Sequence, residues 1–148
     1  MLYHGWDDPV IQPEILLNYY RSVVARMGQP DSDQFIRLFM VPGLQHCTTG
    51  PGPIRFRQAS DESGVSAQAD PEHDISLALE RWVEKGLAPE AIVAAKFVDD
   101  SSGHNSDPTK GILRTRPLCA YPQVARWKGT GSTDDAADFV CVKEKSGK

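Results

Sequence analysis

Hydrophobic residues recur at helical spacing in residues 13–27, which predicts an amphipathic helix there. The apolar positions are Leu16, Tyr19, Tyr20, Val23, Val24 and Met27. Pro13 suits the first turn of a helix because its missing N–H would have no partner there. Gly28 is a typical stop, since glycine readily adopts the backbone that ends a helix.

A second apolar stripe predicts another helix. It consists of Ile75, Ala78, Leu79, Trp82 and Val83. Asp70 and Pro71 stand just before this stripe and match an N-cap followed by proline at the first helical position. Gly86 is the expected end of this helix.

Three apolar stretches, residues 2–4, 35–41 and 92–98, are predicted strands. The nearly continuous apolar run at 35–41 is typical of a strand buried on both faces of a parallel sheet. Strands alternating with helices favour an α/β fold with mostly parallel strands. So few strands leave unpaired sheet edges, which indicates a piece of a larger domain.

Two long segments lie outside these predicted helices and strands. Residues 43–69 are rich in Gly, Pro, Ser and Thr and predict a long loop, which in a compact domain is usually functional. We expect 92–98 to be the final strand, and residues 99–148 to form an irregular extension of the domain that begins at 1–98, because the tail has little periodicity.

Composition describes an ordinary globular chain. It has 148 residues, 40% hydrophobic and 24% charged, enough for one domain with a core. The net charge is −4 and no basic run occurs, which argues against a nucleic-acid or anionic-membrane partner. No apolar stretch approaches the roughly 20 residues that span a bilayer. No signal peptide is visible at the start, which leaves the compartment open.

Polar side chains follow two of the predicted strands. Asp7 and Asp8 come after the first, and His46 and Cys47 after the second. Sites in open α/β sheets form at the carboxyl ends of strands. An acid followed by a histidine 38 residues later matches the second half of the Ser…Asp…His order of α/β-hydrolases, in which the carboxylate orients the imidazole. A metal site built from the same four residues is an alternative.

The three cysteines are Cys47, Cys119 and Cys141, with no Cys-x-x-Cys spacing. A zinc knuckle or thioredoxin-like motif is therefore not indicated. The residues alone leave two interpretations open. Either the thiols are free and buried, or there is one internal disulfide and one cysteine whose partner lies elsewhere.

Four segments resemble the tannase and feruloyl esterase family. His4-Gly-Trp-Asp-Asp-Pro-Val-Ile11 resembles its acid loop, and Arg37-Leu-Phe-Met-Val-Pro-Gly-Leu-Gln-His-Cys47 resembles its histidine loop, followed by Gly-Pro-Gly-Pro. Residues 114–125 and 134–142 resemble its C-terminal segments. The likeness runs from His4 to Val142.

This resemblance implies the C-terminal portion of an α/β-hydrolase with a serine triad. Asp8 matches the family acid because it directly precedes proline; Asp7 is the less favoured choice. His46 matches the catalytic histidine. The implied reaction is hydrolysis of aromatic esters such as gallates, ferulates or related phenolic or phthalate esters, with a small aromatic ester as partner. The sequence leaves the acyl and alcohol specificity open.

The resemblance also implies two disulfides. Cys47 would pair with a cysteine that directly precedes the serine and lies outside this chain. Cys119 and Cys141 would bridge the tail, which stabilises by roughly 3 kcal/mol in the chain-entropy model. Disulfides favour a secreted or periplasmic protein.

The chain departs from the family in what it lacks. It has no Gly-x-Ser-x-Gly motif, and the oxyanion hole and the lid, where many members bind calcium, are missing too. We therefore predict no cofactor or metal in this chain, no ester turnover by it alone, and the missing N-terminal part of the same protein as partner. The alternative is a non-catalytic remnant or binding module with the same fold elements.

The remaining polar residues near these loops have plainer interpretations. His4, His73 and His104 are expected to be surface or structural residues. Arg55 and Arg57 border the histidine loop and could meet an acidic substrate group, but solvated arginines are the simpler expectation.

Overall fold

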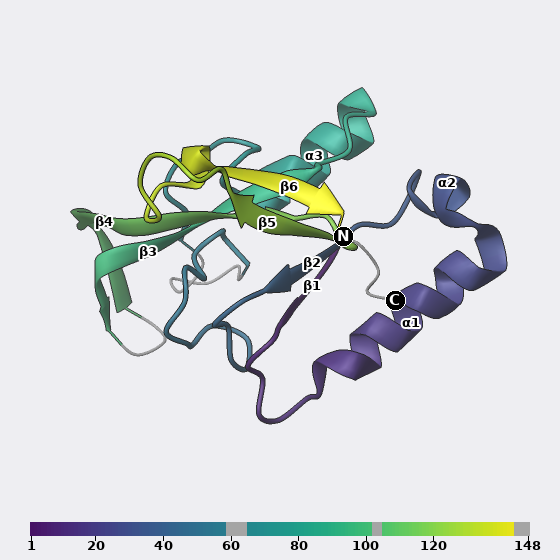
Figure 1. Cartoon of the computed structure of the whole chain (residues 1–148), viewed down its shortest axis with the longest axis horizontal. Coiled ribbons are helices and arrows are strands. Elements are labelled where there is room, and N and C mark those ends of the chain that lie inside the picture. Colours follow the sequence, from purple (N-terminus) through teal and green to yellow (C-terminus); the bar gives the residue numbers. More distant parts are fainter. Residues whose placement is uncertain (59–64, 102–104, 144–148) are drawn as a thin grey trace.

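The computed structural model describes residues 1–58, 65–101 and 105–143, so His104 lies outside the described residues. Figure 1 shows helices on the outside of short sheets. The elements are, in order, β1 Leu2–Gly5, α1 Pro13–Met27, α2 Gln29–Ser32, β2 Leu38–Val41, α3 Ile75–Lys85, β3 Ala91–Ser101, β4 Asn105–Cys119, β5 Gln123–Trp127, a 3-10 helix Ala136–Asp138 and β6 Phe139–Lys143. In the described part of the chain no helix has the length and apolar character needed to cross a membrane.

The first predicted helix is confirmed as α1, which begins at Pro13. It ends where Gly28 adopts a φ of 84°, a backbone that side chains disfavour. Leu17 and Tyr20 carry its buried face. They pack with Leu38, Met40 and Ile36 on one side of β2.

Strand β2 is buried on both faces, as its continuous apolar sequence predicts. Leu38 and Met40 face the cluster under α1. Phe39 and Val41 face a second and larger cluster. β2 pairs in parallel with β1, in a register that places Leu2 opposite Leu38 and continues along both strands. The mixed α/β class is therefore confirmed.

The expected mostly parallel sheet is wrong for the second half of the chain. β3 pairs antiparallel with β4, and β5 pairs antiparallel with β6. Residues 92–98 therefore lie in β3, which is not the final strand. The described tail contains three more strands, β4, β5 and β6. The register shifts on either side of Phe97, and such bulges disrupt the two-residue alternation that marks a strand in sequence.

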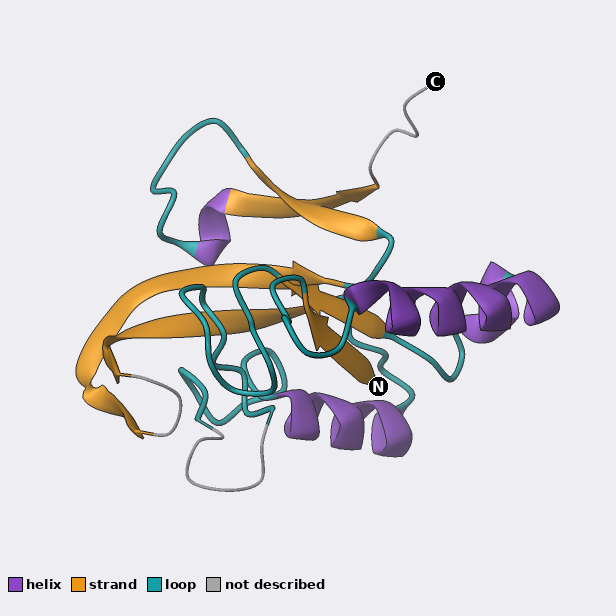
Figure 2. Cartoon of the chain, turned by 90° about the horizontal axis from the view of Figure 1, so that it is seen from below, coloured by secondary structure: helices purple, strands orange, loops and turns teal. Residues whose placement is uncertain are grey.

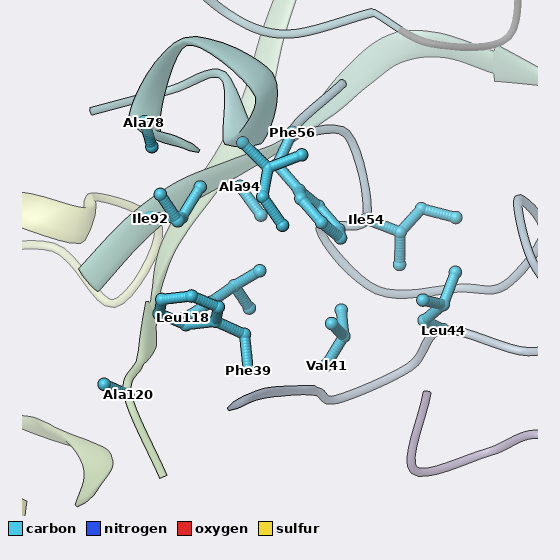
Figure 3. Packing of buried hydrophobic residues seen from close by; sticks show 11 residues of the cluster. Phe39, Val41, Leu44, Ile54, Phe56, Ala78, Ile92, Ala94, Leu118 and Ala120 are labelled. Atoms are coloured by element: carbon cyan, nitrogen blue, oxygen red, sulfur yellow. The ribbon is translucent and has the colours of Figure 1, made fainter. Parts of the chain in front are cut away.

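The larger cluster joins the long loop to the hairpin of β3 and β4 (Figure 3). Its buried members are Phe39, Val41, Leu44, Ile54, Phe56, Ile75, Ala78, Ile92, Ala94, Leu118 and Ala120. Ile54 and Phe56 come from the predicted loop and are completely buried. Figure 2 shows the β5–β6 hairpin on one side of the β3–β4 hairpin and α3 on the other.

Helix α3 starts four residues later than predicted. Its N-cap is Asp74, whose carboxylate accepts the backbone N–H groups of Ser76 and Leu77. The expected cap, Asp70, instead binds the N–H groups of the turn that follows it. Both aspartates can cap locally, and packing decides between them, since Ile75 N–H donates to the Phe56 carbonyl of the core. Gly86 ends the helix as predicted.

Phe39→Ala should lower the free energy of unfolding by about 3–5 kcal/mol, because it empties a fully buried site in the larger cluster. Phe35→Ala is the matched control: Phe35 is about half exposed, and its loss should cost less than about 1 kcal/mol. Urea unfolding of both variants measures the difference. Equal losses would contradict the assignment of β2 as the central strand.

Candidate active site

Parallel pairing of β1 and β2 brings the two predicted site residues together. The strands end side by side, and the pairing continues past them through hydrogen bonds from Trp6 N–H to Val41 C=O and from Asp7 N–H to Leu44 C=O. The Asp8 Oδ2 and His46 Nδ1 atoms lie 3.1 Å apart. Residues 38 positions apart in sequence are thus in hydrogen-bond contact.

The Asp8 carboxylate is fixed by the backbone of its own loop. Its Oδ1 accepts the N–H groups of Val10 at 2.8 Å and Ile11 at 2.9 Å, and its side chain is only 5% exposed. Desolvation opposes its ionisation, but the Ile11 and Val10 N–H groups and the His46 ring outweigh that effect and lower the pKa of Asp8 to about 2. Asp7 is exposed to solvent. The geometry therefore pairs His46 with Asp8.

The His46 ring is in position to act as a base. An ionised carboxylate only accepts hydrogen bonds, so Nδ1 carries the proton and donates to Asp8. The other ring nitrogen, Nε2, then holds a lone pair. The His46 side chain is 44% exposed, so the ring is only partly covered by the described residues.

His4, which was expected to be a surface or structural residue, is a neighbour of this pair. Its Nδ1 lies 3.9 Å from Asp8 Oδ2, and its side chain is mostly buried. His4 belongs to β1, four residues before Asp8, so the strand end and the turn after it bring the two together. The position of His4 near the end of the strand that leads into the acid loop is the sequence signal that could have indicated its closeness to Asp8.

Glycines allow two close backbone contacts, one between the end of β1 and the histidine loop and one within the histidine loop. A Cβ atom on Gly5 would lie 2.0 Å from the Leu44 carbonyl oxygen, and one on Gly50 would lie 1.9 Å from the Gly43 carbonyl oxygen. Real Cβ atoms do not come that close to oxygen, so glycine is required at both positions. Main-chain packing therefore brings the end of β1 against the loop that carries His46.

The three cysteines have different surroundings. Cys119 and Cys141 form a disulfide that joins the end of β4 to β6, as predicted. Cys47 is a free thiol in this structure and is exposed. It follows His46 directly and has a φ of 63°, which is unusual for a residue other than glycine.

The expectation of solvated arginines is wrong for Arg55. This side chain is 1% exposed and forms an ion pair with Asp100. The β3–β4 hairpin covers it, and that hairpin was not predicted from the sequence. Arg57 is about half exposed and lies 3.6 Å from Asp74.

Two further features bear on ligands. Within the described residues, no three His, Cys, Asp or Glu side chains are arranged to hold a metal ion. A cleft of about 890 Å³ runs between β2 and the β5–β6 hairpin, and its walls include Trp6, Met40, Tyr121 and Phe139. Asp8 and His46 do not line it. Of the residues that line the cleft, Trp6 in the acid loop is the nearest in sequence to Asp8.

Comparisons with known proteins agree on one family. The family model described as tannase and feruloyl esterase matches residues 1–142. An uncharacterized esterase of Xanthomonas campestris pv. campestris is 46% identical over 99% of this chain and 26% of its own length. A mono(2-hydroxyethyl) terephthalate hydrolase of Piscinibacter sakaiensis is 37% identical over 96% of this chain and 19% of its own length.

A solved structure shows the same fold. The crystal structure of feruloyl esterase B from Aspergillus oryzae matches with a TM-score of 0.78 and 33% identity, over 95% of this chain and 26% of that one. The chain therefore spans between about a fifth and about a quarter of the length of these relatives.

Asp8→Asn should change how stability depends on pH. A carboxyl whose pKa is lowered from 3.8 to about 2 by folding stabilises the protein above pH 3.8, and this contribution is lost as the pH falls toward 2. The stability of the wild type relative to Asp8→Asn should therefore shrink as the pH falls from about 4 to about 2. Urea midpoints measured across this range test it, with the exposed Asp7→Asn as control. A constant difference would contradict the lowered pKa of Asp8.

Gly5→Ala should destabilise the chain by about 3 kcal/mol or more, because its methyl group meets the Leu44 carbonyl and the backbone must move. Gly86→Ala is the control. It meets no atom within 4 Å and carries only the cost of its left-handed backbone, about 1–2 kcal/mol. Chemical denaturation compares the two. A wild-type midpoint for Gly5→Ala would show that the loops do not pack backbone to backbone.

Proposed function

The chain belongs to the tannase and feruloyl esterase family, and on this basis we propose that it supplies the acid and the histidine of a serine carboxylic-ester hydrolase. Asp8 is the orienting acid and His46 the general base. The observation that carries the proposal is the 3.1 Å contact between Asp8 Oδ2 and His46 Nδ1, made across 38 residues at the carboxyl ends of two parallel strands. This is the relation that a triad requires of its last two members.

The proposed chemistry follows from the free Nε2 of His46. This nitrogen takes the proton of a serine hydroxyl as the serine oxygen attacks the ester carbonyl, and it then gives that proton to the departing alcohol. Water then attacks the resulting acyl-serine, and His46 takes a proton from that water. His46 gives the proton to the departing serine oxygen, which releases the carboxylic acid and restores the serine. Asp8 stays ionised throughout and stabilises the imidazolium, which suits a pKa near 2.

In this proposal the serine comes from a part of the protein outside this chain. The relatives are about four to five times as long as the matched segment, which leaves ample chain for a nucleophile, an oxyanion hole and a lid. Cys47 then forms a disulfide with a cysteine beside that serine, and its exposed thiol is accessible to a partner. Such a bridge would hold the serine beside His46. The calcium expected from the family belongs to the lid.

The proposed substrates are esters of aromatic acids. The supporting relatives are a feruloyl esterase and a mono(2-hydroxyethyl) terephthalate hydrolase, whose names describe esters of two different aromatic acids. Because a disulfide joins Cys119 and Cys141, we also propose an oxidising compartment, outside the cell or in the periplasm.

The experiment compares the isolated chain with the protein encoded when the reading frame is extended upstream of Met1. Hydrolysis of methyl ferulate and of mono(2-hydroxyethyl) terephthalate is assayed for both. We expect no His46-dependent turnover by the isolated chain. In the longer protein, Asp8→Asn should reduce kcat by about 10⁴-fold, because the histidine loses its orienting charge. Asp7→Asn, at the adjacent exposed position, should leave kcat within about threefold.

Three results would count against the proposal. Full activity in Asp8→Asn would remove the acid from the mechanism. His46-dependent hydrolysis by the isolated chain would show that no further segment is needed. An upstream stop codon followed by a soluble, cooperatively folded chain without activity would favour a non-catalytic remnant or binding module.

A further inference from the structure

A buried ion pair lies beneath the histidine loop. The guanidinium of Arg55 donates to Asp100 Oδ1 from Nε at 2.8 Å and from Nη2 at 2.6 Å. The two side chains are 1% and 3% exposed. A buried pair of this kind is not in itself a strong source of stability, because both charges lose their hydration. The further hydrogen bonds of Arg55 indicate a more specific role.

The third arm of the guanidinium reaches the histidine loop. Arg55 Nη1 donates to the carbonyl oxygen of Thr48 at 3.2 Å. Thr48 N–H in turn donates to the carbonyl of His46 at 2.9 Å, which closes a three-residue turn around Cys47. Gln45 N–H donates to the Thr49 carbonyl at 2.8 Å and closes the wider loop.

This turn adopts an unfavourable backbone. A three-residue turn whose central residue has a positive φ is rare and strained, and Cys47 has a φ of 63°. Such a conformation persists only where the surrounding structure enforces it. The bond from Arg55 to Thr48 comes from the protein interior and holds the residue that closes the turn.

The ion pair is itself anchored to β3 and β4. The backbone of Arg55 exchanges both of its hydrogen bonds with Ala95 of β3, each at 2.9 Å. Asp100 stands near the end of β3, where Ser106 of β4 donates its hydroxyl to the same Oδ1 and the Lys96 ammonium lies 3.9 Å from Oδ2. The guanidinium thus connects the β3–β4 hairpin to the segment that carries His46.

We propose that Arg55, held by Asp100, is a positioning residue for His46: it fixes the turn at Cys47 and so keeps the imidazole against Asp8. The inference rests on the proposed function for its catalytic meaning, but the contact chain that it describes can be measured in this chain without any activity. Arg55 touches no reacting group. It acts through Thr48 and the backbone of the turn.

The test uses nuclear magnetic resonance of the chain, with two signals. One is the amide exchange rate of Thr48, normalised to the Ala78 amide of α3 as a reporter of global unfolding. The other is the downfield His46 Nδ1 proton signal that a hydrogen bond to Asp8 produces. Arg55→Lys keeps the charge beside Asp100 but has only one donor group. We expect Thr48 exchange to accelerate about tenfold or more, and the Nδ1 signal to broaden or vanish.

Arg37→Lys is the matched control. Arg37 is another buried arginine that binds a backbone carbonyl and a carboxylate, but it does so at the opposite end of β2, through Asp33 C=O and Glu90. A merely structural role for buried arginines would change both variants alike. We expect Arg37→Lys to leave the normalised Thr48 exchange and the Nδ1 signal unchanged.

Asp100→Asn is a second variant that keeps the side-chain shape and removes the charge that holds Arg55. If Arg55→Lys does not fold, Asp100→Asn decides the test. The Thr48 amide of Asp100→Asn should exchange faster than that of the wild type. Wild-type Thr48 exchange and an intact Nδ1 signal in either folded variant would overturn the inference. Absence of the Nδ1 signal in the wild type would instead contradict the proposed Asp8–His46 pair, while the Thr48 exchange would still report on Arg55.

Discussion

The structure depends on the parallel pairing of β1 with β2. This pairing extends over only four residues of each strand, yet β2 is covered on both faces, by α1 on one side and by the larger cluster on the other. Because the strands run in the same direction, the loops that follow them leave from the same edge. Asp8 and His46 lie in those two loops, so the candidate pair is a consequence of strand direction and register.

Strand ends alone place side chains only approximately, and main-chain contacts provide the remaining precision. Gly5 lets the acid loop approach the Leu44 carbonyl, and two backbone N–H groups hold the Asp8 carboxylate. The histidine loop is closed by the hydrogen bond from Gln45 N–H to the Thr49 carbonyl. The buried Arg55 guanidinium donates a further hydrogen bond to the Thr48 carbonyl. The Asp8 carboxylate is thus held by backbone groups, whereas the histidine loop is held by its own backbone hydrogen bonds and by the buried Arg55 side chain.

The surface of the chain agrees with the proposal that it works within a longer protein. Helices α1 and α3 each bury part of their apolar face, while Ile15 and Val83 are largely exposed. The second stripe predicted a helix correctly, yet only Ile75 and Ala78 of it are buried residues. A partner segment that covered these faces would remove apolar surface from water, which is the main favourable term in association.

The sequence by itself determined the features that depend on neighbouring residues: α1 with its stop at Gly28, the doubly buried β2, and the order of Asp8 and His46 along the chain. The tertiary structure alone decided the features that need distant partners. β4 becomes a strand because β3 lies beside it, α3 begins at Ile75 because the Ile75 N–H bonds to the Phe56 carbonyl, and Arg55 is buried together with its partner Asp100. Local patterns report which backbone a segment prefers, whereas burial and pairing arise only when segments far apart in sequence come into contact.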